Sequence, residues 1–474
     1  MSTFSGLNTA MTGLNAARVG LETTGNNIIN VNTPGYTRQR AELSAVGALA
    51  STGLIASRPG LGQGVSVAGI ARLADAHLDA RLNATSGAVG QADTRAAALM
   101  DIEATLREPG ENGLSAILGK FWNAWEGVAN QPGEAAPATV LISSANDVAA
   151  RLKLMHGELS DQWSAQRTSL DTMASELNST AARVAELNGS ITSTIAAGGN
   201  ANEMLDQRDM LVTRLAELSG ATTQTNPDGT VNVMLGGGNL VTGSTPNKVT
   251  LDGPSALGEG SGFSVSLETG TGSTTVTIDG GRIAGVLSLL GPANDTGTGG
   301  AIAQMASSLD AVAKNLAETV NTVHQGGFTA SGTQGTDFFS LADGVPAAAG
   351  LGVVIGSASQ LATKDKSTAG TLDGSNALKI ADLATKKGGP DEQWSTVVIS
   401  SGLAAQAEAQ QSVNAALAHN AAASQQQAAT GVSLDEENVA LLAYQHAYQG
   451  AARVMTAVDE MLDTLINRTG IVGR

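Results

Sequence analysis

Hydrophobic residues recur every seven positions at both ends of this chain, and this repeat constrains its fold more than any other feature. Near the amino terminus, one complete row and the start of a second are present: Leu7, Leu14, Leu21, Ile28, Phe4 and Met11. Arg18 and Gly25 interrupt the second row. A seven-residue repeat lies along one side of an α-helix and needs a partner to bury it. The first 30 residues are therefore predicted as a helix, either an ordinary amphipathic helix on a globular body or one half of a coiled coil.

The carboxy-terminal repeat is more regular and predicts a second helix. Its two rows alternate at spacings of four and three: Leu434, Leu441, Tyr448, Met455, Leu462, and Tyr444, Ala451, Val458, Leu465. Glu437 is the departure from this pattern. Ser433 followed by Glu436 is typical of a capping box, in which the two side chains satisfy each other's backbone amides at the helix start. Arg468 and then Gly470 suit the helix end.

The first helix is predicted to end in an asparagine cluster followed by a turn. The cluster consists of Asn26, Asn27, Asn30 and Asn32. Residues 33–36 then read Thr-Pro-Gly-Tyr, with proline second and glycine third. Proline fixes φ and glycine accepts positive φ, so this order predicts a type II turn.

The middle of the chain combines long helices with a β-rich insert. Apolar spacing predicts a short helix over 114–128 and a long one over 139–197, whose 59 residues would span roughly 90 Å, longer than a compact domain. Further helices are predicted over 70–107, 202–219, 301–324 and 391–430. Between 222 and 278, short alternating runs separated by Gly-rich turns predict a small β domain. The fold of residues 325–389 is not predicted.

Composition argues against several classes of function. The formal net charge is −17, which disfavours nucleic acid as a partner. There is no cysteine, and the five histidines show no metal-ligand spacing, so neither a metal nor a cofactor is expected. No nucleotide-binding loop or nucleophile elbow is present. The acidic residues 435–437 fit the first turn of a helix better than an acid–base pair. These observations give no prediction of catalysis. No membrane-spanning apolar run or signal peptide is present, so membrane contact is not predicted either.

Three stretches resemble bacterial flagellar axial proteins. Residues 13–17 read Gly-Leu-Asn-Ala-Ala, and residues 26–39 read Asn-Asn-Ile-Ile-Asn-Val-Asn-Thr-Pro-Gly-Tyr-Thr-Arg-Gln, which resembles the amino-terminal signature of flagellar rod, hook and hook-associated proteins. Residues 205–211 and 431–437 are similar to segments of hook-associated proteins. The combination resembles the FlgK family. The motif residues are Asn27, Asn30, Asn32, Pro34, Gly35 and Tyr36.

The resemblance implies a mainly α fold with an inserted β domain, in which long helical rods and paired terminal helices form a nested multidomain protein. The expected units are a terminal coiled-coil domain (1–50 plus 431–474), a long-helix domain (51–220 plus 295–430) and an outer β-rich domain (221–294). The expected assembly interface consists of heptad residues: Phe4, Leu7, Met11, Leu14, Leu21, Ile28, Leu434, Leu441, Tyr444, Tyr448, Met455, Val458, Leu462 and Leu465.

The resemblance also implies a structural role at the hook–filament junction of the flagellum. Its members are exported unfolded without a cleavable signal peptide and form an extracellular ring of eleven subunits on the hook tip. Implied partners are the hook protein, hook-associated protein 3 and an export chaperone at the carboxy-terminal region. The alternatives are another axial protein, such as hook-associated protein 3 or a hook or rod protein, or a secreted adhesin or enzyme carried by the β insert.

Two further hypotheses follow from the heptads. The terminal segments have few turns and unpartnered stripes, so we expect them to be largely unfolded in the free monomer and to become helical on assembly. Arg18 occupies a position where the stripe expects an apolar group. It is predicted to pair with a carboxylate of the carboxy-terminal helix, the alternative being a side chain that extends into solvent.

Overall fold

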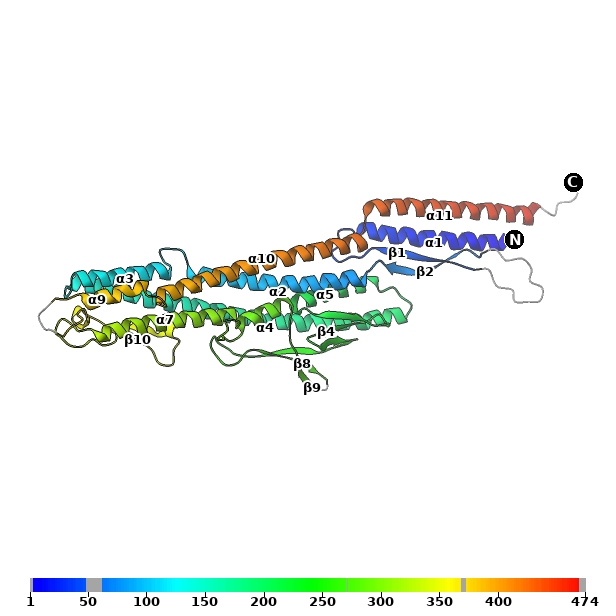
Figure 1. Cartoon of the computed structure of the whole chain (residues 1–474). Helices are drawn as coiled ribbons and strands as arrows, with labels where there is room; N and C mark the ends of the chain where they lie inside the picture. The colour runs from blue at the N-terminus through cyan, green and yellow to red at the C-terminus, as the bar shows by residue number, and fades with distance from the viewer. Residues whose placement is uncertain (1–2, 48–61, 271, 368–371, 469–474) are drawn as a thin grey trace.

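The computed structural model describes residues 3–47, 62–270, 272–367 and 372–468. It is a long, narrow molecule with both termini at one end (Figure 1). At that end α1 (Thr3–Ile29) runs antiparallel beside α11 (Leu434–Asp463), and these two helices are called the terminal pair. A π-helical turn, Thr464–Arg468, follows α11. The predicted fold class, mainly helical with a β insert and paired terminal helices, is confirmed.

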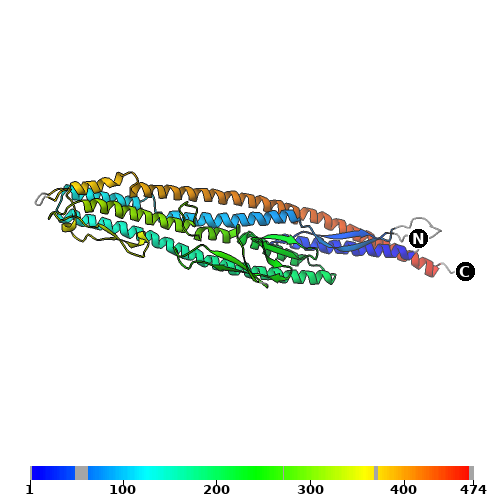
Figure 2. The ribbon, with the colours of Figure 1, turned by 60° about the horizontal axis from the view of Figure 1, so that its bottom comes forward.

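A bundle of long helices, here called the long-helix body (residues 76–430), forms the rest of the molecule (Figure 2). Its helices are α2 (Ala76–Leu106), α3 (Leu114–Asn130), α4 (Ala135–Ala196), α5 (Asn202–Ser219), α6 (Gly281–Leu290), α7 (Ala301–Gly326), α8 (Ala347–Gly350), α9 (Ser375–Ala381) and α10 (Pro390–Thr430). The predicted helices over 114–128, 139–197, 202–219, 301–324 and 391–430 correspond to α3, α4, α5, α7 and α10, and are confirmed. Helix α6 was not predicted.

The β insert packs on α4 as two antiparallel sheets. One contains β3 (Thr222–Thr225), β4 (Val231–Leu235), β5 (Gly238–Thr242) and β6 (Thr245–Pro246), and the other β7 (Lys248–Asp252), β8 (Ser264–Thr269) and β9 (Gly272–Thr275). In the segment without a predicted fold, β10 (Phe339–Leu341) pairs with β11 (Leu351–Val353). Two short 3₁₀ helices, Ala358–Gln360 and Asp382–Thr385, complete it.

Asparagine side chains fix the insert to α4. The side-chain Nδ2 of Asn188 donates to the carbonyl of Val231 at 2.8 Å, and its Oδ1 accepts from the Val231 backbone amide at 3.2 Å. Ten residues earlier on α4, Asn178 makes the same two bonds with Val249, both at 2.8 Å. Each asparagine thereby satisfies both backbone groups of one strand residue, as a neighbouring strand would.

A β-hairpin lies against α1 where a helix start was predicted. Strand β1 (Gln39–Ala45) pairs with β2 (Val65–Arg72), so the prediction of helix over 70–107 is wrong for its first residues. Residues 70–72 complete the hairpin ladder. Helix α2 then begins after Asp75, whose side chain accepts hydrogen bonds from the amides of His77 and Leu78. That carboxylate satisfies two of the free amides at the helix start, which sets the boundary.

Candidate assembly interface and polar junction

Small residues on α1 face the second heptad row of α11. Gly6, Gly13 and Gly20, called the glycine row, lie opposite Val458, Ala451 and Tyr444, respectively. A methyl group on Gly13 would lie 3.9 Å from Cβ of Ala451, whereas one on Gly20 would overlap the ring of Tyr444. Since both rows repeat every seven residues in opposite directions, the antiparallel register is kept along the whole pair.

The predicted interface residues differ in how far they are exposed. Partly buried residues are Leu7, Leu14, Leu21, Ile28, Leu441, Tyr444, Met455 and Leu462, and Val458 is buried. Exposed residues are Met11 (57%), Leu434 (46%), Tyr448 (38%) and Leu465 (52%). The side chain of Phe4 lies outside the described set. The structure also exposes apolar residues on α11 that the heptad rows do not contain: Val439 (68%), Leu442 (53%) and Met461 (54%).

The Arg18 prediction is wrong. Its guanidinium lies 3.9 Å from Glu22, one turn along the same helix, and both side chains are more than half exposed. Arg18 follows the row of Met11, on the side of α1 away from α11, so the carboxylates of α11 are not its ion-pair partners in the structure. The alternative of a solvent-directed side chain fits its position better.

The glycine row ends in a buried polar contact. Asn27 continues its seven-residue spacing, and the Asn27 side-chain amide donates to a carboxylate oxygen of Glu437 at 3.0 Å. Asn27 also donates to the Gln39 carbonyl at 2.8 Å, accepts from the Gln39 amide at 3.0 Å, and accepts from the Tyr36 hydroxyl at 2.9 Å. Asn27 and Glu437 are only 1% and 2% exposed. The heptad exception is therefore a buried residue of this contact.

Arg38 neutralises Glu437. Its Nε donates to the Glu437 carboxylate at 2.7 Å, and its Nη1 donates to Glu436. The predicted capping box is wrong in its bonds: Ser433 is the residue before α11, but its side chain makes no capping bond, and Glu436 binds Arg38 instead of the Ser433 amide. The helix start itself is confirmed. A charged donor is a stronger partner for a carboxylate than a backbone amide at a helix end.

A third segment, the first turns of α5, completes the cluster. Asp206 accepts from the Thr37 amide at 3.1 Å and lies 3.3 Å from Nε of Arg72. Arg72 also donates to Asp209 at 2.5 Å. Asn202 donates to the Ile70 carbonyl at 2.9 Å. These bonds attach the β-hairpin, and with it the terminal pair, to the long-helix body.

Together these residues form what is here called the polar junction: Asn27, Tyr36, Thr37, Arg38, Gln39, Arg72, Asn202, Asp206, Asp209, Glu436 and Glu437. The three sequence stretches 26–39, 205–211 and 431–437 meet in it. Burial raises the pKa of Asp206, and the Thr37 amide and Arg72 oppose that rise. Burial and the neighbouring carboxylates Asp206, Glu203 and Glu437 raise the pKa of Tyr36 to about 12, so Tyr36 remains a hydrogen-bond donor.

The other motif residues shape the turn that leads into the junction. Asn30 donates to the Asn26 carbonyl at 3.0 Å and accepts from the Thr33 hydroxyl at 3.0 Å. Asn32 and Pro34 are exposed. Gly35 has φ of 76°, and the Tyr36 amide donates to the Thr33 carbonyl at 3.2 Å. The predicted turn is thus confirmed, and it directs Tyr36 back onto α1.

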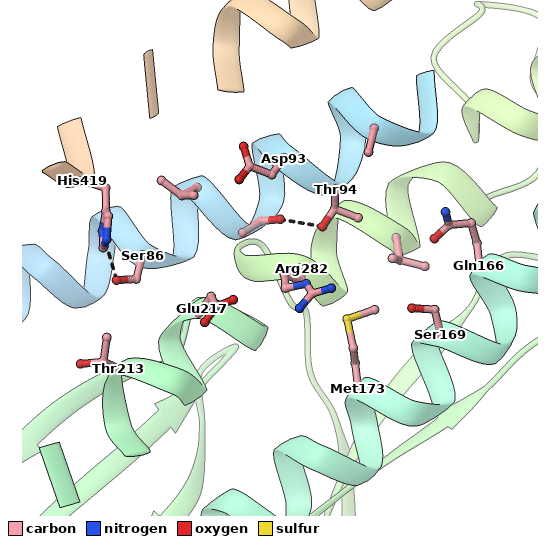
Figure 3. A pocket seen from close by; sticks show the side chains of 14 residues that line it. Ser86, Asp93, Thr94, Gln166, Ser169, Met173, Thr213, Glu217, Arg282 and His419 are labelled. Atoms are coloured by element: carbon pink, nitrogen blue, oxygen red, sulfur yellow. Dashed lines mark hydrogen bonds between the residues drawn. The ribbon is translucent and has the colours of Figure 1, made fainter. Parts of the chain in front are cut away.

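A cleft of about 620 Å³ lies between α2, α4, α5, α6 and α10. Ser86 Oγ and His419 Nδ1 lie 3.4 Å apart at one end of it (Figure 3). Ser86 already donates to the Leu82 carbonyl, and Asp93 accepts from Ser412 rather than orienting His419. In the described ranges, no group of three metal-ligating side chains is found, and no helix is long and apolar enough to cross a membrane. The cleft therefore offers no nucleophile–base arrangement.

Comparisons with known proteins agree with the position of these stretches. Residues 99–339 match the family model described as flagellar hook-associated protein FlgK helical domain. Residues 7–37 match that of flagella basal body rod protein, and residues 424–468 that of flagellar basal body rod FlgEFG protein C-terminal.

Relatives of known name are similar over much or all of the chain. It is 30% identical over 505 residues to flagellar hook-associated protein 1 of Bacillus subtilis (strain 168), with all of both chains covered. It is 27% identical to the protein of the same name from Salmonella typhimurium, over 71% of this chain and 59% of that protein. The solved flagellar hook junction protein FlgK from Burkholderia pseudomallei superposes with a TM-score of 0.61 at 14% identity, covering 73% of this chain and 99% of the other, and shares its fold.

Proposed function

The chain belongs to the FlgK family, that of flagellar hook-associated protein 1, and we propose that it builds the hook–filament junction by packing copies of itself through the apolar faces that the terminal pair leaves exposed. As a member of this family it is a structural protein of the bacterial flagellum. The observation that carries the proposal is the exposure of Val439, Leu442 and Met461 on α11 and of Met11 on α1. Large apolar side chains left exposed along a surface helix are typical of a protein contact.

The geometry of the terminal pair supports contacts between copies. Its internal contact uses the glycine row, so the two helices approach closely and bury little of their larger side chains. On α11, only Glu437 and Val458 are buried among the described side chains. Packing of neighbouring copies against these exposed apolar side chains would remove them from water and so stabilise the assembly.

The polar junction supplies a fixed angle between the terminal pair and the long-helix body. Buried networks of hydrogen bonds and ion pairs rigidify the elements that they connect. Because α1, the hairpin, α5 and α11 all contribute to it, assembly through the terminal pair would place every long-helix body identically. Regular placement is what a ring requires.

The proposal includes the partners and location that the resemblance implies. These are an extracellular ring of eleven copies on the hook tip, with the hook protein and hook-associated protein 3 as neighbours, export without a cleavable signal peptide, and a chaperone at the carboxy-terminal region. The domain division into 1–50 plus 431–474, 51–220 plus 295–430, and 221–294 is likewise proposed. We add β2 to the terminal domain because it pairs with β1.

Deletion of the gene tests the proposal directly. We expect cells with hooks but without filaments by electron microscopy, and flagellin released into the medium. Plasmid expression of the full chain is expected to restore filaments. Normal filaments in the deletion strain would exclude a role at the junction, and loss of hooks as well would indicate a rod or hook protein instead.

A further inference from the structure

The outer face of helix α10 carries no charge. Between residues 393 and 430 its one charged side chain is Glu408, in a chain of net charge −17. Glu408 accepts from Nε and Nη2 of Arg95 on α2, at 2.9 and 2.6 Å. Ser412 donates to Asp93 and Gln426 to Asp79, both also on α2. The side of α10 away from α2 is therefore neutral.

Apolar residues follow this neutral side in a regular order. Residues at spacings of four and three, called the outer row, are Ile399, Leu403, Gln406, Gln410, Val413 and Leu417. Its four apolar members are 60%, 62%, 52% and 63% exposed, in that order. The buried residues Trp394, Ala405 and Ala415 lie on the opposite side of the helix, and α2 is the main neighbour of α10. Alternating spacings of four and three are typical of a seam that packs on another helix.

We propose that the outer row of α10 is a lateral contact site for a second copy of this chain within the assembled junction. The inference rests on the proposed function and names a contact outside the terminal pair. Charge selects this occupant, because two strongly acidic copies repel one another over most of their surfaces and approach at lower cost along a neutral face.

Position favours the same occupant. Only residues 431–433 separate α10 from α11, and both helices lie along the same side of the molecule (Figure 1). Copies held together by their terminal pairs would therefore carry α10 alongside a neighbour. The contact continues the proposed interface of the terminal pair rather than forming a separate one.

The size of the seam indicates that it works only in the assembly. The outer row spans residues 399–417, about 28 Å of helix, and a strip about 10 Å wide along it covers roughly 280 Å². Stable interfaces bury about 800 Å² on each partner. The outer row is thus too small, and too diluted by Gln406 and Gln410, to hold a dimer by itself. It contributes once the terminal pairs have raised the local concentration.

Site-specific photocrosslinking in assembled flagella tests the inference. The full chain carrying p-benzoyl-phenylalanine in place of Leu403 is expressed in the deletion strain, and hook–junction complexes are isolated and irradiated. The matched control carries it in place of Gln411, which is exposed on the flank of the same helix. From position 403 we expect an adduct of twice the chain mass that contains only this chain. The adduct should be absent when the photocrosslinker is at position 411 and when the protein is a free monomer.

Other results would contradict this inference without contradicting the proposed function. An adduct of position 403 with a different protein, no adduct, or equal adducts at both positions would exclude a second copy as the occupant of the outer row. A Leu403→Glu/Leu417→Glu variant provides an independent readout, with Ser400→Glu/Gln411→Glu adding the same charge beside the seam. We expect filament loss only in the first. If gene deletion itself leaves filaments intact, it is the proposed function that fails.

Discussion

The long-helix body and the terminal pair bury their apolar side chains very differently. Along α4, Leu141, Leu152 and Leu170 are fully buried in one continuous core. On α11, Val439 and Leu442 remain more than half exposed, and the tightest contact with α1 is made by glycine. Apart from the outer row of α10, the body thus contains the partners that its helices need, whereas the terminal pair lacks them within one copy. A single chain combines a largely self-sufficient unit with one whose burial is completed by neighbours.

The largest effect is expected in the body. Trp125 is fully buried, with its ring 5.2 Å from Phe338 and 6.2 Å from His324 between centroids. Trp125→Ala should reduce the free energy of unfolding by about 3–5 kcal/mol through the lost burial and the cavity. Chemical denaturation of the purified chain measures it, with Met461→Ala on α11 as an exposed control. A similar loss in both variants would contradict the comparison.

Leu441→Asp should give the opposite pattern. It places a carboxylate in the partly buried row of α11, where an unpaired charge is strongly unfavourable. We expect loss of filaments in a complementation assay while the midpoint of body unfolding stays at the wild-type value. Gln449→Asp adds the same charge at an exposed position of α11 and should assemble normally. Motile cells carrying Leu441→Asp would show that the Leu441 row of α11 is not needed for assembly.

The polar junction should depend on Glu437 far more than on its neighbour. Glu437→Ala leaves Arg38 and Asn27 without their buried acceptor, which we expect to cost about 3 kcal/mol. Glu436→Ala removes a 63% exposed partner of the same arginine and should cost less than about 1 kcal/mol. Amide exchange at residues 27–39 in assembled protein measures both. Equal protection in the two variants would mean that the buried pair does not hold the junction.

Two glycines in the glycine row provide a matched pair of smaller effects. Gly13→Ala places its methyl at an ordinary distance from Ala451 and should stabilise α1 by roughly 0.5–1 kcal/mol, since alanine favours helix. Gly20→Ala overlaps the Tyr444 ring, so the helices must separate locally, at a cost of about 1–3 kcal/mol. Heat dissociation of assembled protein should shift in opposite directions. Shifts of the same sign would place α11 elsewhere.

Heptads, turn chemistry and apolar spacing were enough to predict the two terminal helices, the long helices and the turn at Gly35, whereas the pairing of the terminal helices was predicted from the family resemblance. They could not predict the glycine row, because glycine weakens a helix and signals close packing only when the facing residue is known. Glu437 departed from the heptad pattern for a reason that the local sequence does not show, because its partners, Asn27 and Arg38, lie some 400 positions away in the chain.

The asparagine contacts show most clearly which features could not be predicted from the sequence. Asn27 with Gln39, Asn188 with Val231 and Asn321 with Phe339 each bind the amide and the carbonyl of one extended residue. Asn27 belongs to the family motif, but nothing in the neighbouring sequence distinguishes Asn188 and Asn321 from solvated asparagines. The hairpin β1–β2 was missed because its first strand, Gln-Arg-Ala-Glu-Leu-Ser-Ala, contains no β-branched residue. Such features depend on contacts between distant residues rather than on local propensity.

The smallest expected effect concerns acid sensitivity of the body. His324 is fully buried; its Nδ1 lies 2.6 Å from the Thr336 carbonyl, and its Nε2 accepts from the Ala362 amide at 3.0 Å. Burial lowers the pKa of His324, so the folded form holds it neutral while the unfolded chain still takes up a proton below about pH 6.5. The unfolded state then binds more protons, and stability must fall as the pH is lowered.

We therefore expect the unfolding midpoint of the body, followed by tryptophan fluorescence because Trp125 adjoins His324, to decrease between about pH 7 and about pH 5.5. His324→Gln keeps a side-chain acceptor for the Ala362 amide but does not titrate, so its midpoint should be lower at pH 7 and flatter below it. A wild-type slope in that variant would assign the acid sensitivity to other groups. Because His324 lies in the core of the body, exchange of the terminal pair should not follow this titration, which separates the two regions once more.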